Sequence, residues 1–243
     1  MNTEPTFPPL LTGLAVTGQI DPFQKAISLA TLGCDAGTIV HNISNEYLRA
    51  AFIFAPEVSL EKACAMMIAC GLGFSNALGS LAPPEVAVHL KWNGEILVNG
   101  ALCGELKISA SHVDPDTIPN WLIVGIKVPL FPTNDDGGGH TPNQTTLFEE
   151  GCAEVDPVKL LESWSRHTLV WINRWSDEGS APIHAEWRSK AHGLGEDIST
   201  TLHGTDIDGL FLGIDEDFGM LIRLGDDTKV KPLSSLLQNG VSA

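Results

Sequence analysis

The sequence predicts an α+β protein, with a mixed or antiparallel sheet backed by helices over residues 1–196 and a small β-barrel over residues 197–243. In residues 86–92 apolar side chains alternate with others, which is the pattern of a half-buried strand. Asn99-Gly100 favours a tight hairpin, because both central residues of a type I′ turn need a positive φ. Residues 121–130 are nearly all apolar, as in a strand covered on both faces. The centre of the chain is therefore expected to be an antiparallel meander of about four strands.

Three helices are expected, and two of them are marked by the same dipeptide. Asp21-Pro22 and Asp156-Pro157 each combine a capping carboxylate with a proline suited to the first helical position. Ser59 is the expected N-cap of the remaining helix. The helices are predicted over residues 23–32, 60–72 and 157–177. Glycines and prolines after the middle helix, up to Pro84, indicate a loop.

The remaining segments complete the expected order. Two strands, over residues 37–42 and 48–54, are joined by a short polar turn, and residues 1–20 form an extended lead-in over the surface. Residues 131–143 contain three consecutive glycines and are expected to be a mobile surface loop, placed where it could also act as a lid. Residues 198–237 consist of short apolar runs between glycine-containing turns, which predicts a barrel of about five strands.

Composition and charge limit the classes of partner. The chain has 243 residues, of which 43% are hydrophobic and 18% charged, so it can bury a core. Its net charge of −16 argues against nucleic acid and anionic membranes as partners, because both are bound by clustered lysine and arginine. Without a leader pattern or a long apolar run, the chain is expected to be cytoplasmic. Its five cysteines lack C-x-x-C spacing and fit reduced, buried thiols rather than disulfides or a zinc site.

Three motifs follow one another in the central strands. They read Lys91-Trp92-Asn93-Gly94-Glu95, then Ala101-Leu102-Cys103-Gly104-Glu105-Leu106, then Val124-Gly125-Ile126-Lys127. In order and spacing they resemble K-W-P-N-D, K-x-A-G-I-L and G-x-G-I-N of biotin–protein ligases and the related lipoate–protein ligases. Glu178-Gly179, Pro182 and Trp187 resemble the linker after the long helix of that family. Residues 211–221 resemble the G-I-D-x-x-G-x-L pattern of its C-terminal SH3-like domain.

The resemblance implies both a fold and a chemistry. The fold is that of the ligases, without the helix-turn-helix domain that some bacterial members carry in front. In the chemistry, biotin or lipoate reacts with ATP to form an acyl adenylate, and the acyl group then passes to a lysine of an acceptor domain. ATP and biotin or lipoate are implied as cofactors by the resemblance only. The implied partners are a small carboxylic acid and a biotinyl or lipoyl acceptor domain.

Three departures from the family bear on that chemistry. In the ligases the strands that match residues 37–42 and 48–54 flank an arginine-rich loop, G-R-G-R-x-G-R, whose arginines bind phosphate and carboxylate oxygens. Here only the short turn separates them. Ala101 replaces the motif lysine, and Lys127 replaces the asparagine of G-I-N. Adenylate formation needs cations that hold phosphates. We therefore expect little or no ordinary ATP-dependent ligation, and no arginine reaching the ligand cavity.

The resemblance also implies a set of site residues. The ligand-binding candidates are Asn42, Lys91, Trp92, Asn93, Gly104 and Gly125, the catalytic candidates are Cys103 and Lys127, and no metal ligand is expected. Cys103 shares a face with Glu105 and Lys107 if its strand is regular, although a free cysteine commonly just packs in a core. Lys91 and Lys107 fit a solvated strand face equally well. Trp92 fits either the cavity wall or the core.

Lys127 carries the strongest expectation. An ammonium group in an apolar strand is costly unless it is paired or solvated. We expect its side chain to point into a cavity and contact the carboxylate of a bound acid, with Gly104 and Gly125 allowing close backbone approach. Three functions stay open. They are an acyl ligase or acyltransferase with altered chemistry, a non-catalytic module that binds biotin, lipoate or a fatty acyl group, and an interaction protein whose cavity is vestigial.

Overall fold

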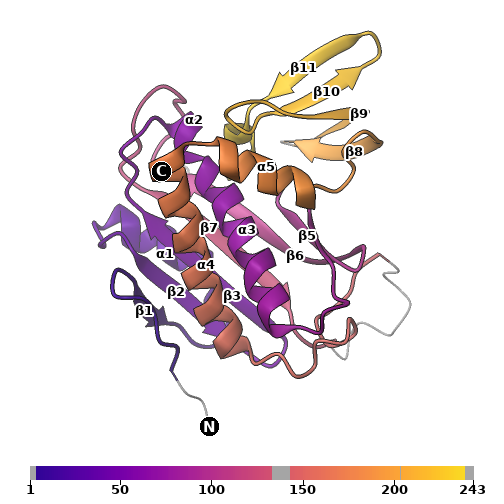
Figure 1. The fold of residues 1–243 in the computed structure, drawn as a ribbon. Coiled ribbons are helices and arrows are strands. Elements are labelled where there is room, and N and C mark those ends of the chain that lie inside the picture. Colours follow the sequence, from indigo (N-terminus) through magenta and orange to yellow (C-terminus); the bar gives the residue numbers. More distant parts are fainter. Residues whose placement is uncertain (1–3, 133–142, 203, 239–243) are drawn as a thin grey trace.

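A computed structural model describes residues 4–132, 143–202 and 204–238. The loop expected over residues 131–143 therefore lies almost entirely outside the described residues. The chain forms a large sheet with helices on both faces, followed by a smaller sheet at one end (Figure 1). This is the expected α+β class.

The large sheet has seven strands in the order β1-β2-β3-β7-β6-β5-β4. They are β1 (Thr12–Ala15), β2 (Thr38–Ile43), β3 (Tyr47–Phe54), β4 (Val88–Leu90), β5 (Glu95–Val98), β6 (Ala101–Ala110) and β7 (Leu122–Pro129). Only β1 and β2 pair in parallel, and all other neighbours are antiparallel, so the sheet is mixed. The predicted central meander is confirmed as β4 to β7. The expected lead-in is wrong in part, because β1 pairs along the edge of the sheet.

Two of the turns behave as their sequences predict. Asn99 has a φ of 51° and Gly100 a φ of 92°, which are the positive values that a type I′ hairpin requires. The connection from β2 to β3 is short, since it consists of residues 44–46 alone. In it, the side chain of Ser44 accepts hydrogen bonds from the backbone N–H groups of Glu46 and Tyr47. The predicted short turn is confirmed.

Five helices are described, and the three predicted ones begin where the sequence indicates. They are α1 (Pro22–Thr31), α2 (Leu60–Ala63), α3 (Ala65–Leu81), α4 (Pro157–Glu178) and α5 (Ala181–Lys190). The carboxylate of Asp21 accepts a hydrogen bond from Phe23 N at 3.1 Å, and that of Asp156 accepts one from Val158 N at 2.8 Å. Both predicted aspartate caps are therefore confirmed.

Two predicted loops are helices. The middle helix does not end near Leu72 but continues to Leu81. It passes through Gly71 and Gly73, where glycine fits because neighbouring elements lie too close for a larger side chain. A Cβ atom at Gly73 would lie 2.8 Å from the backbone nitrogen of Thr168 on α4. The segment between α4 and the second sheet, expected as a linker, contains α5, whose Ile183 and Trp187 are buried.

The helices cover the two faces of the large sheet unequally (Figure 1). Helices α3 and α4 pack against each other and over one face, where Trp164 is fully buried and its indole N–H donates to Cys70 O at 2.9 Å. Leu161, Trp164, Thr168 and Trp171 form the buried stripe of α4. On the other face α1 covers a smaller apolar cluster, in which Phe23 packs with Ala51, Ile53 and Ile123.

The stretch Leu60–Leu81 is long and apolar enough to cross a membrane, with a mean hydropathy of 1.5. However, 78% of it is buried inside the protein, where α3 packs against α4. It is therefore accounted for as a core helix.

The second sheet consists of β8 (Asp197–Leu202), β9 (Thr205–Ile214), β10 (Met220–Leu224) and β11 (Asp227–Lys231), followed by a 3-10 helix, η1 (Leu233–Leu236). It fits the expected SH3-like fold, with four described strands rather than about five. Its core is continuous with that of the large unit. The backbone N–H of Gln238 also donates to Ile108 O on β6 at 2.8 Å. The division at residues 196 and 197 stays a prediction.

Candidate functional site

A row of polar and charged side chains crosses the α1 face of the large sheet. Strand pairing places its members opposite one another in the order Asn42, Arg49, Lys127, Glu105 and Glu95, on β2, β3, β7, β6 and β5. We call these residues the charged row. The charged row lies beyond the part of the face that α1 covers. The strand residues next to it along the chain point to the opposite, helix-packed face and are mostly apolar.

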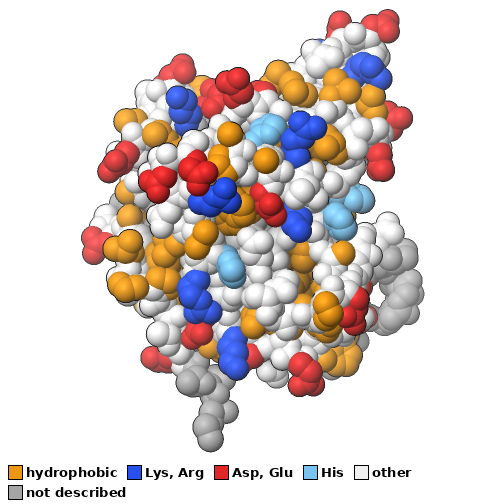
Figure 2. Space-filling model, viewed as in Figure 1, with side chains coloured by type: hydrophobic (Ala, Val, Ile, Leu, Met, Phe, Trp, Pro, Cys, Tyr) orange, Lys and Arg blue, Asp and Glu red, His pale blue; other side chains and the backbone are white. Residues whose placement is uncertain are grey.

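An open pocket of about 200 Å³ lies over this row and beside the start of α1. Its lining consists of Asp21, Pro22, Phe23, Arg49, Ala50, Glu105, Lys107, Gly125, Ile126 and Lys127. Five of these ten residues are charged, so the pocket is more polar than its position in an apolar sheet would indicate. Elsewhere, on the face that carries α4 and α5, basic and acidic side chains are interspersed (Figure 2).

Arg49 enters the pocket from β3 rather than from a loop. Its guanidinium donates to Oδ1 of Asn42 at 3.1 Å, and Nδ2 of Asn42 donates in turn to Val16 O at 2.9 Å. The Nε atom of Arg49 is buried without a hydrogen-bond partner among the described residues. The expectation that no arginine reaches the cavity is therefore wrong. Asn42 is buried and contacts the pocket residue Arg49 without lining the pocket itself.

Lys127 points into the same pocket but is exposed, with its Nζ atom 4.7 Å from the centroid of the Tyr47 ring. The strand was expected to be apolar on both faces, and that is wrong. Its α1 face runs from Ile123 through Gly125 to Lys127, so only its first part is covered. Lys127 lies directly opposite Arg49 on one side and Glu105 on the other.

The two glycines allow close approach, but to protein groups. A Cβ atom at Gly125 would lie 2.5 Å from the ring of Phe23, so the aromatic ring of α1 occupies the space over this residue. Gly104 has a φ of 156°, and a Cβ atom there would lie 2.8 Å from Lys127 O. It therefore lets β6 approach the backbone at Lys127.

Lys91, Trp92 and Asn93 lie away from this pocket, toward the second sheet. The ammonium of Lys91 pairs with Glu95 at 2.6 Å, and Oδ1 of Asn93 accepts from Glu95 N at 3.2 Å. Trp92 is buried, and its indole N–H donates to Phe218 O at 2.8 Å. Trp92 packs in the core, where it joins the two units, and with Lys91 and Asn93 it also lines a pocket of about 220 Å³, so both expected environments fit it.

Cys103 is fully buried in the main core cluster and is separate from Lys127. Burial, followed by the charges of Glu150, Cys152 and Glu149, raises the pKa of its thiol. The expectation that it shares a face with Glu105 and Lys107 is wrong, because the pairing of β5 with β6 shifts at this point. Ile96 pairs with Gly104 and Leu97 with Leu102, which leaves Cys103 as the extra residue of a β-bulge.

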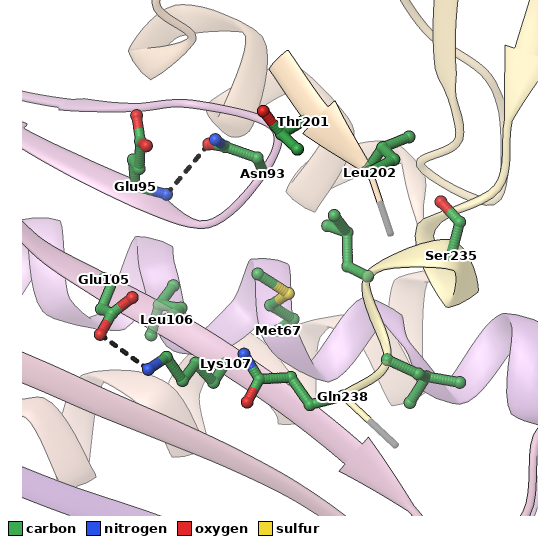
Figure 3. A pocket seen from close by; sticks show the side chains of 12 residues that line it. Met67, Asn93, Glu95, Glu105, Leu106, Lys107, Thr201, Leu202, Ser235 and Gln238 are labelled. Carbon is green, nitrogen blue, oxygen red and sulfur yellow. Dashed lines mark hydrogen bonds and ion pairs between the residues drawn. The ribbon is translucent and has the colours of Figure 1, made fainter. Parts of the chain in front are cut away.

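A second pocket, of about 360 Å³, adjoins the first at the boundary with the C-terminal unit. Figure 3 shows it with Glu105 and Lys107, which pair at 2.9 Å, on one side and Asn93 and Thr201 on the other. Glu105 and Lys107 line both pockets. The sequence interpretation left Glu105, Lys107 and Arg49 outside the site. The alternation of polar residues in β6 could have indicated Glu105 and Lys107.

The comparisons with known proteins agree with this architecture. Residues 7–189 match the model of the Biotin/lipoate A/B protein ligase family, and residues 194–239 match a domain of unknown function, DUF4444. The structure of a biotin protein ligase-like protein of unknown function from Silicibacter sp. TM1040 is 54% identical, with a TM-score of 0.89 over 97% of this chain and 100% of that one.

Two further relatives are biotin ligases by name. A biotin–[acetyl-CoA-carboxylase] ligase from Paracoccus denitrificans is 27% identical over 77% of this chain and 78% of its own. Biotin protein ligase from Aquifex aeolicus, at 19% identity, shares the fold with a TM-score of 0.74 over 93% of this chain and 96% of its own. With the family model covering most of its length, the chain belongs to the Biotin/lipoate A/B protein ligase family.

Proposed function

We propose that this chain is a divergent member of the family that binds a small carboxylic acid in the pocket over the charged row, without the ordinary ATP-dependent ligation. The observation that carries the proposal is the position of Arg49 directly opposite Lys127 across β3 and β7. Like charges in directly opposed positions destabilise a sheet. An anion held between them would remove that repulsion and gain charge-assisted hydrogen bonds from both groups.

The charges around the pocket support an anionic ligand. Glu105 pairs with Lys107, and Asp21 is occupied in part by capping α1. Within the described ranges, neither Arg49 nor Lys127 forms a salt bridge. A surplus of cations in one pocket of a chain with a net charge of −16 favours the binding of an anion there. The charges indicate an anion, and the family resemblance indicates that this anion is a carboxylate.

The residues present do not fit an acyl adenylate. Residues 44–46 form only a tight turn, so β2 and β3 offer no loop that could wrap around phosphates. Ala101 supplies no cation, and Phe23 fills the space over Gly125. An acyltransferase that uses Cys103 is supported less, because a buried thiol with a raised pKa supplies little thiolate.

The test is a calorimetric titration of the wild type and Lys127→Met with the acid that raises the melting temperature most in a screen of biotin, lipoate and octanoate. The variant keeps the apolar stem and removes the charge. It should lose about tenfold or more in affinity, since a charge-assisted hydrogen bond contributes roughly 1.5–3 kcal/mol. Its stability should hardly change, because Lys127 is exposed. Lys229→Met, an exposed lysine on β11, is the matched control.

Two results would contradict the proposal. One is equal affinity in the wild type and Lys127→Met. The other is strong ATP–pyrophosphate exchange that depends on biotin or lipoate, which would show that other cations replace the missing loop. A cytoplasmic location is part of the proposal. A biotinyl or lipoyl acceptor domain would become its partner only if such exchange were found.

A further inference from the structure

The polarity of the pocket bears on the kind of acid that it takes, an inference that rests on the proposed function. The floor of the pocket is formed by β3, β7 and β6, and on β6 Glu105 and Lys107 pair at 2.9 Å and are 40% and 38% exposed. An apolar acyl chain laid across this pair would remove water from both charges and return no hydrogen bonds. Desolvation of that kind is costly.

The apolar part of the α1 face is also already covered. Phe23 is 5% exposed and packs with Ala51, Ile53 and Ile123. Its ring lies so close to Gly125 that a single methyl group there would meet it at 2.5 Å. The side chain of Phe23 therefore covers the surface against which the alkyl chain or apolar ring of a ligand would otherwise pack. What remains open is the charged part.

Beyond the ion pair, the surface continues to offer hydrogen-bonding groups. Glu105 and Lys107 also line the second pocket, in which Asn93, Thr201, Ser235 and Gln238 are further polar members (Figure 3). A ligand that extends past the pair thus meets amide and hydroxyl groups from both units of the protein. Such convergent polar groups fix orientation and specificity in small-molecule sites.

We propose that the acid is a monocarboxylate whose body carries hydroxyl or amide groups, and not an apolar acyl chain. Its carboxylate lies between Arg49 and Lys127, and its polar body lies along Glu105 and Lys107, which offer an acceptor and a donor. The charges agree with one negative charge on the ligand. Three cations and two carboxylates line the pocket, so one further carboxylate makes the numbers equal.

The test compares two acids of the same carbon number and charge, hexanoate and gluconate, by calorimetric titration of the full chain. Gluconate should bind on the order of tenfold tighter, as expected when one or two hydrogen bonds are gained. The double variant Glu105→Leu, Lys107→Leu gives the floor an apolar surface and should reverse the order of the two affinities. Its folding is checked by thermal unfolding, and Glu105→Gln, Lys107→Met is the milder alternative that should reduce the preference.

The outcomes separate this inference from the proposed function. If hexanoate binds more tightly than gluconate to the wild type, and Lys127→Met weakens both, the site binds an acid but the inferred class is wrong. If neither acid binds, the inferred class is wrong, and titration with the acid found in the screen of biotin, lipoate and octanoate still decides the proposed function. If Lys127→Met changes neither affinity, the proposed function itself fails and the inference fails with it. A preference for gluconate that survives in the leucine double variant would also overturn the role given to the ion pair.

Discussion

The two faces of the large sheet differ in what covers them. On the helix-packed face, α3 and α4 bury a continuous apolar surface that includes Phe52 and Trp164, with almost no accessible area left. On the α1 face, one ten-residue helix covers a small cluster, and the charged row is left open beside it. Because alternate residues of a strand point to opposite faces, the same strands form both the core wall and the pocket floor.

This difference teaches where to look for function in a divergent family member. Residues on the helix-packed face are constrained by volume, so changes there should affect the free energy of unfolding. Residues of the charged row are constrained by charge, so changes there should affect binding and leave stability nearly unaltered. Substitutions on the two faces can therefore test the comparison directly.

The largest effect is expected from Gly73→Ala on the helix-packed face. The new methyl group would lie 2.8 Å from the backbone nitrogen of Thr168, which cannot move away by changing a rotamer. We expect a loss of about 3 kcal/mol in the free energy of unfolding, as in other overpacked cores. Gly79→Ala, in the same helix but exposed with nothing within 4 Å, should instead stabilise by up to about 1 kcal/mol. Similar stability of both variants in chemical denaturation would contradict the close contact.

These glycines also show why part of the fold could not be predicted. Helix starts were predictable because a cap and a proline act on the nearest few residues, and both Asp-Pro pairs did so. The course of α3 depends instead on Thr168, about a hundred residues away in the chain, which lies where a side chain at Gly73 would be. Propensity disfavours glycine in a helix, and tertiary packing overrides it here.

The sequence predicted the region of the candidate site but only some of the residues that form it. The family resemblance led to Lys127 and Asn42, and strand pairing brings both into the charged row with Arg49. Cys103 was misplaced because a single extra residue in β6 shifts its pairing with β5, and strand alternation cannot reveal such a bulge. Lys127 was expected in an apolar surrounding because nothing in the sequence shows how far α1 extends over β7.

A smaller effect is expected from Gly125→Ala on the α1 face. Here the close contact is with the ring of Phe23, a side chain on the first turn of a short helix, so part of the strain can be relieved by movement of α1. We expect a loss of about 1–2 kcal/mol, at the low end for overpacking. Phe23→Leu makes room, so the double variant should be less destabilised than the sum of the two single changes. Simple additivity in a double-mutant cycle would show that the ring does not occupy this space.

The smallest expected effect is a pH dependence of the free energy of unfolding that arises from one histidine on the helix-packed face. His41 on β2 is 6% exposed and lies beside Phe7, with ring centroids 5.9 Å apart. Burial lowers the pKa of its imidazole, and Glu4 opposes this shift more weakly. In the folded protein the imidazole therefore binds a proton less readily than in the unfolded chain. Its contribution to stability is present above the unfolded pKa of about 6.5 and is lost as pH falls through the lowered folded pKa.

The measurement is the free energy of unfolding of the wild type and His41→Gln between pH 8 and pH 5. Glutamine does not titrate, so the difference between the two proteins isolates the proton that His41 fails to bind. His167, whose pKa is also lowered by burial, is present in both proteins and cancels. The wild type should lose stability relative to His41→Gln as the pH falls below about 6.5. A constant difference across this range would show that the imidazole titrates alike in the folded and unfolded states, and hence that this edge of the helix-packed face is more open to water than its packing indicates.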